Sequence, residues 1–205
     1  MHKQNTLRIW ELSALVGLCL CLLAGTWSEA RLSSISARLV RLHVLAASDA
    51  PEEQAVKLRV RDAVLEAISP MLAGAESADE AEAVLREALP AVREAAERAA
   101  GGRPVAVSLS PERYPTRDYG GFRLPAGRYR SLRVVLGEGR GHNWWCVVFP
   151  PVCLSAVQAE ALRPAMNSAD YALLTGTEGW ELRFRSVELW GELMARLAAH
   201  GFLSD

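Results

Sequence analysis

Few side chains in this 205-residue sequence are spaced in a way that could support catalysis. His43 could in principle pair with Asp49 or Asp118, and Ser48 could act as a nucleophile, but no glycine-flanked elbow surrounds this serine. A lone histidine on an apolar strand is more often a core residue than an acid or base. None of the histidines after residue 30 stands at the spacing of a zinc ligand pair. We therefore expect no enzyme, no metal and no cofactor.

The glycine-rich segment 137–141 has the composition of a phosphate-binding loop. Such a loop must open a helix whose N-terminus meets the phosphate, yet residues 143–147, which follow it, have the pattern of a strand. This context excludes a nucleotide site. A flexible hairpin turn accounts for the glycines instead.

Trp144 and Trp145 are neighbours on the strand predicted there, so their side chains must face opposite sides of the sheet. One indole can fill the core, while the other, next to Asn143, can anchor a partner, because aromatic residues dominate binding hot spots. Burial of both indoles under the helices and the C-terminal segment accounts for them equally well.

Two cysteines, Cys146 and Cys153, lie on either side of a Pro-Pro pair. An oxidising compartment would allow them to form a disulfide, and a bridge over so short a loop would contribute about 2 to 3 kcal/mol. Two buried free thiols are the alternative, because free cysteine is a common core residue.

The elements that position these residues form an α/β (α+β) fold: one compact domain of β-α-α-β-β-β order, with two helices packed on a mostly antiparallel sheet. Apolar residues recur at three- and four-residue spacing in the helices and alternate in the strands. Hairpins are the simplest connection between the last three strands. The predicted elements are a strand at 39–46, helices at 51–69 and 77–100, and strands at 105–110, 128–136 and 143–149.

Local residues mark where the helices begin and end. Ser48 and Asp49 supply a cap for the first helix, and Ser77 with Glu80 forms a capping box for the second. Pro90 is expected to end or kink the second helix.

The N-terminus has the pattern of an export signal. His2, Lys3 and Arg8 are basic, the segment 12–24 is almost wholly apolar, and Ser28-Glu29-Ala30 places small residues where a signal peptidase reads them. The apolar stretch is shorter than the roughly 20 residues that usually span a membrane. We expect cleavage after Ala30, with a retained membrane anchor as the alternative.

These observations divide the chain into a signal peptide or anchor at 1–30, a folded domain at 31–155 and a C-terminal extension at 156–205. The extension begins as loop and then predicts a strand at 180–185 and an amphipathic helix at 186–200. Docking of the apolar stripe of this helix on the sheet is favoured over a partner-facing or membrane-surface role.

Composition limits the kind of partner. Half of the residues are apolar and the formal net charge is −1, so the chain can build one core domain but shows no excess of positive charge. Nucleic acids and anionic membrane surfaces both demand a clustered positive field. A protein partner is therefore expected, with membrane contact only through the N-terminal segment if it is uncleaved.

Two blocks of the sequence share the order and spacing of a known family. The first covers residues 40–49, Gln54 and residues 57–64. The second combines Tyr114-Pro115-Thr116-Arg117, Tyr119-Gly120, Pro125-Ala126-Gly127-Arg128-Tyr129, Leu136-Gly137, Gly139, Gly141, Asn143-Trp144-Trp145-Cys146-Val147, Phe149-Pro150-Pro151 and Cys153. Together they resemble the stage II sporulation protein R family, apart from Ala47, where that family usually has asparagine.

The resemblance implies a signal of endospore formation. Members of this family are made in the forespore, are exported into the space between the forespore and mother-cell membranes, and activate a membrane-embedded aspartic protease of the stage II sporulation protein GA type. That protease removes the pro-sequence of sigma-E. The residues expected to bind this partner are His43, Asp49, Tyr119, Asn143, Trp144 and Trp145.

Two other classes of function stay open from the sequence. One is a secreted cell-envelope hydrolase that uses His43 and Asp118, and the other is a module that only binds the envelope. Cleavage of cell wall by the purified domain would distinguish the first class from a signal.

Overall fold

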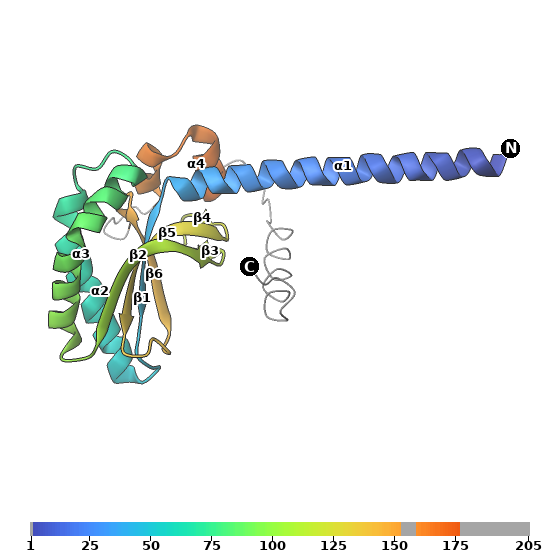
Figure 1. Cartoon of the computed structure of the whole chain (residues 1–205). Helices are drawn as coiled ribbons and strands as arrows, with labels where there is room; N and C mark the ends of the chain where they lie inside the picture. The colour runs from blue at the N-terminus through green and yellow to red at the C-terminus, as the bar shows by residue number, and fades with distance from the viewer. Residues whose placement is uncertain (1, 153–158, 177–205) are drawn as a thin grey trace. The chain divides into compact units, whose positions relative to one another are not determined.

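The computed structural model describes residues 2–152 and 159–176, drawn as the coloured ribbon in Figure 1. The chain forms two units, and the boundary between them lies between Ser34 and Ile35. Most of helix α1 (His2–Ala37) forms the first unit, and the second contains the sheet with its covering helices. The predicted limits of the folded domain at 31 and 155 stay predictions, since residue 155 lies outside the described ranges.

The first unit is a single apolar helix. Within α1, the segment Trp10–Ala37 has a mean hydropathy of 1.6 and is long and apolar enough, by length and composition, to cross a membrane. No other helix among the described residues meets this test. A signal sequence passes it as well, so α1 fits both the cleaved signal and the retained anchor.

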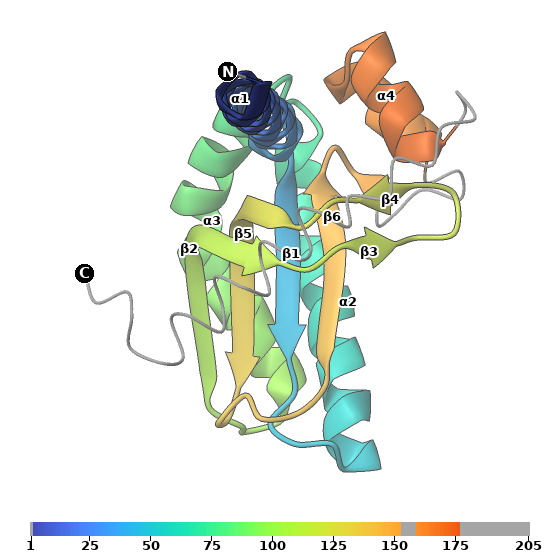
Figure 2. The same cartoon turned by 90° about the vertical axis from the view of Figure 1, so that its right-hand side faces the viewer.

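The second unit is built on a four-stranded sheet with the order β2-β5-β1-β6. Figure 2 shows it from the face opposite its two long covering helices, which we call the open face. The central strand β1 pairs in parallel with β5 and antiparallel with β6, and β2 pairs antiparallel with β5. The predicted mixed fold with a mostly antiparallel sheet is therefore confirmed. The strands are β1 (Val40–Leu45), β2 (Val105–Tyr114), β5 (Gly127–Leu136) and β6 (Asn143–Phe149).

The predicted hairpin between the last two strands is wrong, because β1 lies between β5 and β6. Every residue of β1 is buried, and a strand of this kind needs a neighbour on both sides. The glycine-rich segment therefore crosses the end of β1. There the amide of Gly141 donates to the carbonyl of Ala46 (2.9 Å), and that of Arg140 donates to the carbonyl of Ala47 (3.3 Å).

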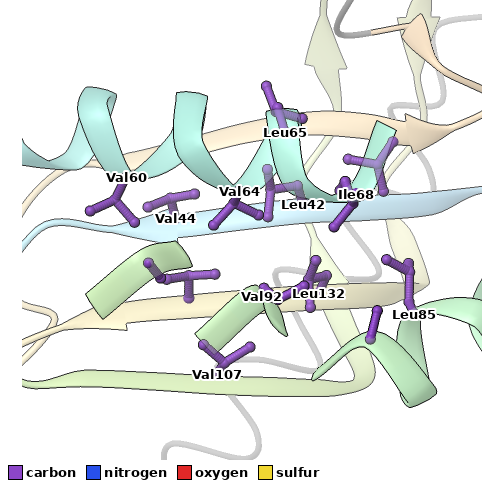
Figure 3. Packing of buried hydrophobic residues seen from close by; sticks show 14 of the residues in the cluster. Leu42, Val44, Val60, Val64, Leu65, Ile68, Leu85, Val92, Val107 and Leu132 are labelled. Carbon is purple, nitrogen blue, oxygen red and sulfur yellow. The ribbon is translucent and has the colours of Figure 1, made fainter. Parts of the chain in front are cut away.

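Two helices, α2 (Pro51–Leu72) and α3 (Ala78–Ala100), cover one face of the sheet. Their apolar stripes meet the inward residues of the strands, as Figure 3 shows for Val60, Val64, Ile68, Leu85 and Val92 against Leu42, Val44, Val107 and Leu132. Burial of this kind contributes about 25 cal/mol per Å² of apolar surface, so the contact between the helices and the sheet stabilises the domain.

The second helix begins as predicted but is not interrupted. The amide of Glu80 donates to Ser77 Oγ (3.2 Å), and Glu80 Oε2 accepts from the amide of Glu76 (2.9 Å). The expected break at Pro90 is absent, since α3 continues to Ala100 and ends at Gly101 in the left-handed conformation (φ 61°). Likewise, α2 runs through Pro70, three residues beyond its predicted end at 69.

The predicted cap of the first helix is also wrong. The capping residue is Ala50, which forms no side-chain cap, and Pro51 opens the helix. The amide nitrogen of Pro51 has no hydrogen to donate, so one of the usual donors is missing. The carboxylate of Asp49 instead accepts from the amide of His142 (2.6 Å).

A second apolar cluster on the other face joins strand residues to a small sheet of β3 (Arg117–Asp118) and β4 (Arg123–Leu124) and to the short helices η2 (Glu160–Ala165) and α4 (Ser168–Thr175). The sequence predicts loop over η2 and α4. However, Asn167 caps α4 by accepting from the amide of Asp170 (2.8 Å), and Gly176 ends it. The predicted elements at 180–185 and 186–200 lie outside the described residues.

Candidate functional site

The open face of the sheet carries buried polar side chains. Residues alternate along β1, so Leu42 and Val44 face the helices while Arg41 and His43 face the other way. Arg41 is 0% exposed and His43 is 5% exposed. Burial of polar groups costs free energy unless they form hydrogen bonds or ion pairs. The partners of these two side chains therefore define the candidate site.

His43 lies between a carboxylate and an amide. Its Nδ1 is 2.9 Å from Oε1 of Glu112 on β2, and its Nε2 is 2.9 Å from Oδ1 of Asn143 on β6. The Glu112 carboxylate also accepts from Ser131 Oγ (2.9 Å) and lies 3.6 Å from Nε of Arg133. The imidazole therefore joins both edge strands across the sheet.

Arg41 is enclosed by aromatic rings. Its guanidinium carbon lies 3.8 Å from the ring centroid of Tyr114 and 4.9 Å from that of Tyr129, and its Nη2 donates to the hydroxyl of Tyr119 (2.6 Å). Burial raises the pKa of both Tyr114 and Tyr129, which keeps them neutral beside the cation. Cation–π attraction compensates part of the cost of burying the charge.

The tryptophans of β6 face opposite sides, as the strand alternation predicts. Trp145 packs on the open face, with ring centroids 5.5 Å from His43 and 6.0 Å from Tyr114, and the Arg117 guanidinium lies 4.4 Å above it. Trp144 packs against the helix layer, where Arg61 lies 4.9 Å from its ring centroid. Both indoles are half-buried.

Four of the six predicted partner-binding residues therefore lie on one face. His43, Asn143 and Trp145 are in direct contact or adjacent, and Tyr119 joins them through Arg41. We call this group, together with Arg41 and Glu112, the polar face. Trp144 lies on the other side of the sheet.

Asp49 lies away from the polar face and binds the loop before β6. Its Oδ1 is 2.5 Å from Nδ1 of His142, in addition to the bond from the amide. The buried Lys57 donates to the carbonyl of His142 (3.0 Å) and to Gln54 (2.6 Å). Burial is the main cause that lowers the pKa of Lys57. This group holds the crossing loop in place.

His43 does not pair with Asp118, the acidic partner that a hydrolase is expected to use. Asp118 accepts from the amide of Gly120 (2.8 Å) and from Arg123 (3.1 Å), whereas the carboxylate beside His43 is Glu112. Among the described residues, no serine, threonine or cysteine bonds to either ring nitrogen of His43. The same residues contain no group of three or more His, Cys, Asp or Glu that could hold a metal ion.

Sequence reasoning missed Arg41 and Glu112. Arg41 is visible as a polar interruption of an apolar strand, which is the signal that could have found it. Glu112 carries no such signal, because it reaches His43 only in the strand order β2-β5-β1.

The predicted disulfide stays a prediction. Cys146 is buried on β6 at 7% exposure, and Cys153 lies outside the described residues.

The fold and the site together define the class: an α/β domain that follows an apolar helix and carries buried polar side chains on one face of its sheet. A model of the stage II sporulation protein R family matches residues 36–159, and the chain belongs to this family. Stage II sporulation protein R of Bacillus subtilis (strain 168) is 37% identical over 118 residues, which are 56% of this chain and 53% of that protein. The chain thus matches about half the length of this curated relative. No solved structure matches it.

Proposed function

We propose that this protein is an exported signal of endospore formation that activates a membrane-embedded aspartic protease of the stage II sporulation protein GA type. The protease would then process pro-sigma-E in the mother cell. The observation that carries the proposal is the family match over residues 36–159, which includes the whole polar face. The apolar helix α1 fits export from the forespore into the intermembrane space, or anchoring there if it is uncleaved.

The proposal requires no chemistry from the signal itself. Both ring nitrogens of His43 already have hydrogen-bond partners within the protein. Neither nitrogen is therefore available to accept a proton from a substrate, as a general base must do. A binding protein can activate a protease by preferring its active arrangement, and the shift is only as large as the difference in affinity for the two states.

We place the contact with the protease on the polar face. Its aromatic and polar side chains resemble those of binding hot spots, where rigid aromatic anchors and arginine are enriched. Asn143 is exposed at the edge of this face, and Trp145 and Tyr119 are half-buried beside it. These three side chains offer the accessible part of the surface.

Processing of pro-sigma-E in a reconstituted host tests the proposal. The host would express the protease and its substrate, with the full chain either exported or kept inside by deletion of residues 10–27. Processing that depends on export supports the signal. A folded, exported chain that gives no processing would leave the envelope hydrolase or envelope-binding module as the better account, and a cell-wall cleavage assay would separate these two.

A pair of variants tests the position of the contact. Asn143→Ala removes an exposed amide from the polar face, whereas Arg93→Ala removes an exposed side chain from α3 on the far side of the sheet. We expect Asn143→Ala to lower processing at least several-fold and Arg93→Ala to leave it unchanged, with both variants keeping their circular dichroism spectrum. Equal activity of the two would move the contact off this face.

A further inference from the structure

Arginines gather at the end of the sheet where the chain enters β1. Arg113 on β2 lies directly opposite Arg128 on β5. Arg130 follows on the same side of β5, and its Nη1 donates to the carbonyl of Ala37 (2.5 Å), the residue before Arg38. Arg38, Arg113 and Arg128 are exposed, and we call these three residues the basic patch.

The basic patch has no acidic partner in the part of the chain that the structure describes. Arg130 is neutralised by ion pairs with Asp79 and Glu82, but the three residues of the patch take part in no ion pair there. The Arg38 guanidinium donates to the carbonyl of Ala165 (3.3 Å). Like charges directly opposite on neighbouring strands destabilise the pair, so the Arg113 and Arg128 side chains would be stabilised by an anion from outside.

The net charge of the whole chain, which is close to zero, does not reveal this cluster. Carboxylates outnumber cations on α2 and α3, whereas arginines outnumber carboxylates in the segment from β2 to β5. The composition alone gives no case for binding an anionic surface, but the fold separates the two signs of charge. A clustered positive field of this kind attracts anions at short range.

We propose that, in chains that retain α1 as an anchor, the basic patch binds the phosphate groups of anionic phospholipids at the membrane that holds this helix. Guanidinium groups bind phosphate through paired hydrogen bonds. Residues 28–37 of α1 rise only about 15 Å at about 1.5 Å per residue, so Arg38 follows the apolar stretch closely enough to reach the headgroup layer. An acidic segment of a partner protein has the same charge, but nothing in residues 2–152 and 159–176 brings such a segment to this place.

Lipid contact can be measured on the full chain inserted through α1 into nanodiscs. Headgroups that carry a gadolinium chelate broaden nearby amide signals, so residues 112–114 and 127–129 report contact at the patch. Residues 137–141, at the opposite end of β5, serve as the internal reference. We expect stronger broadening at the patch when phosphatidylglycerol is mixed with phosphatidylcholine than in phosphatidylcholine alone, and loss of the difference at high salt.

Two triple variants with the same charge change sharpen the result. R38Q/R113Q/R128Q should abolish the effect of phosphatidylglycerol, because each arginine near an anionic surface adds about fivefold to the affinity and the three together roughly a hundredfold. R59Q/R93Q/R98Q, with three exposed arginines elsewhere, should keep it. Broadening that is independent of lipid charge, or equal in both variants, would overturn the proposal and favour an acidic protein partner. The measurement needs no protease, so its failure is separate from failure of the proposed signalling role.

Discussion

Buried polar residues on the polar face depend on one another more than surface residues do. His43 is almost fully buried, and its carboxylate partner Glu112 also accepts from Ser131. A hydrogen bond to a charged group contributes about 1.5 to 3 kcal/mol, and leaving one buried partner unsatisfied costs a similar amount. The two side chains should therefore behave as a unit.

A double-mutant cycle on His43→Gln and Glu112→Gln should give a coupling energy of about 1 kcal/mol, measured by urea unfolding. The exposed ion pair of Arg98 with Glu94 on α3 is the matched control, and its coupling should stay below about 0.5 kcal/mol because solvent screens it. Equal coupling in the two pairs would show that burial does not strengthen the contact with His43.

Gly141 lies where a larger side chain does not fit. A Cβ at this position would overlap the carbonyl oxygen of Ser48 and lie 2.9 Å from Cβ of Ala46. We expect Gly141→Ala to lower the free energy of unfolding by about 1 to 3 kcal/mol, because the backbone of the β1–α2 connection must move. Gly74→Ala, with nothing within 4 Å, should change it by less than about 0.5 kcal/mol. Similar losses in both variants would contradict this explanation.

For single residues, the sequence predicted several side chains of the candidate site but not the residues to which they bond. His43 and Asn143 were predicted as binding residues, and the structure places them in contact. The pairing of Asp49 with His142 could not be predicted, because it depends on a loop that crosses the end of β1. Local patterns carry no information on such long-range contacts.

Among the elements, the helices were easier to predict than the strand order. The three- and four-residue spacing in α2 and α3 is a local property, and both helices lie where this spacing predicts them. Strand order is not local, since β1 pairs with two strands that come much later in the chain. Glycines before β6 fit a tight hairpin and a crossing loop equally well.

An ion pair joins the start of α2 to the segment before β2. Arg103 contacts Glu53 at 2.8 Å, and its hydrogen bond to the carboxylate is the main cause that lowers the pKa of Glu53 below the ordinary value of 4.5. A carboxyl with a lowered pKa in the folded state binds protons more readily when unfolded. Its contribution to stability is therefore present above pH 4.5 and is lost as the pH falls below it.

This linkage predicts that Glu53→Gln is less stable than the wild type near neutral pH and that the difference shrinks on acidification. Thermal unfolding over a pH series would measure it. Glu66→Gln, at an exposed position of α2 that forms no ion pair among the described residues, should follow the wild type at every pH. A constant difference for Glu53→Gln would show that its contribution does not depend on ionisation.

For the whole molecule, the fate of α1 decides whether the domain is released or held at a membrane. The small residues Ser28 and Ala30 predict cleavage that leaves Arg31 as the first residue. Mass spectrometry of the exported protein should give the mass of residues 31–205. Ala30→Leu should block the cleavage, because a signal peptidase reads a small side chain there, whereas Glu29→Gln should not. Recovery of the uncleaved chain from the wild type would identify α1 as an anchor.

The central position of β1 also affects the order in which an exported chain can fold. A chain that crosses a membrane with its N-terminus first delivers β1 early, but the two neighbours of β1 are residues 127–136 and 143–149. Pairings between distant parts of a chain form slowly, because a long loop must close before they contribute. In a chain that is exported, the four-stranded sheet therefore cannot close until Phe149 has crossed the membrane, so the helices would have no complete sheet to pack against before that point.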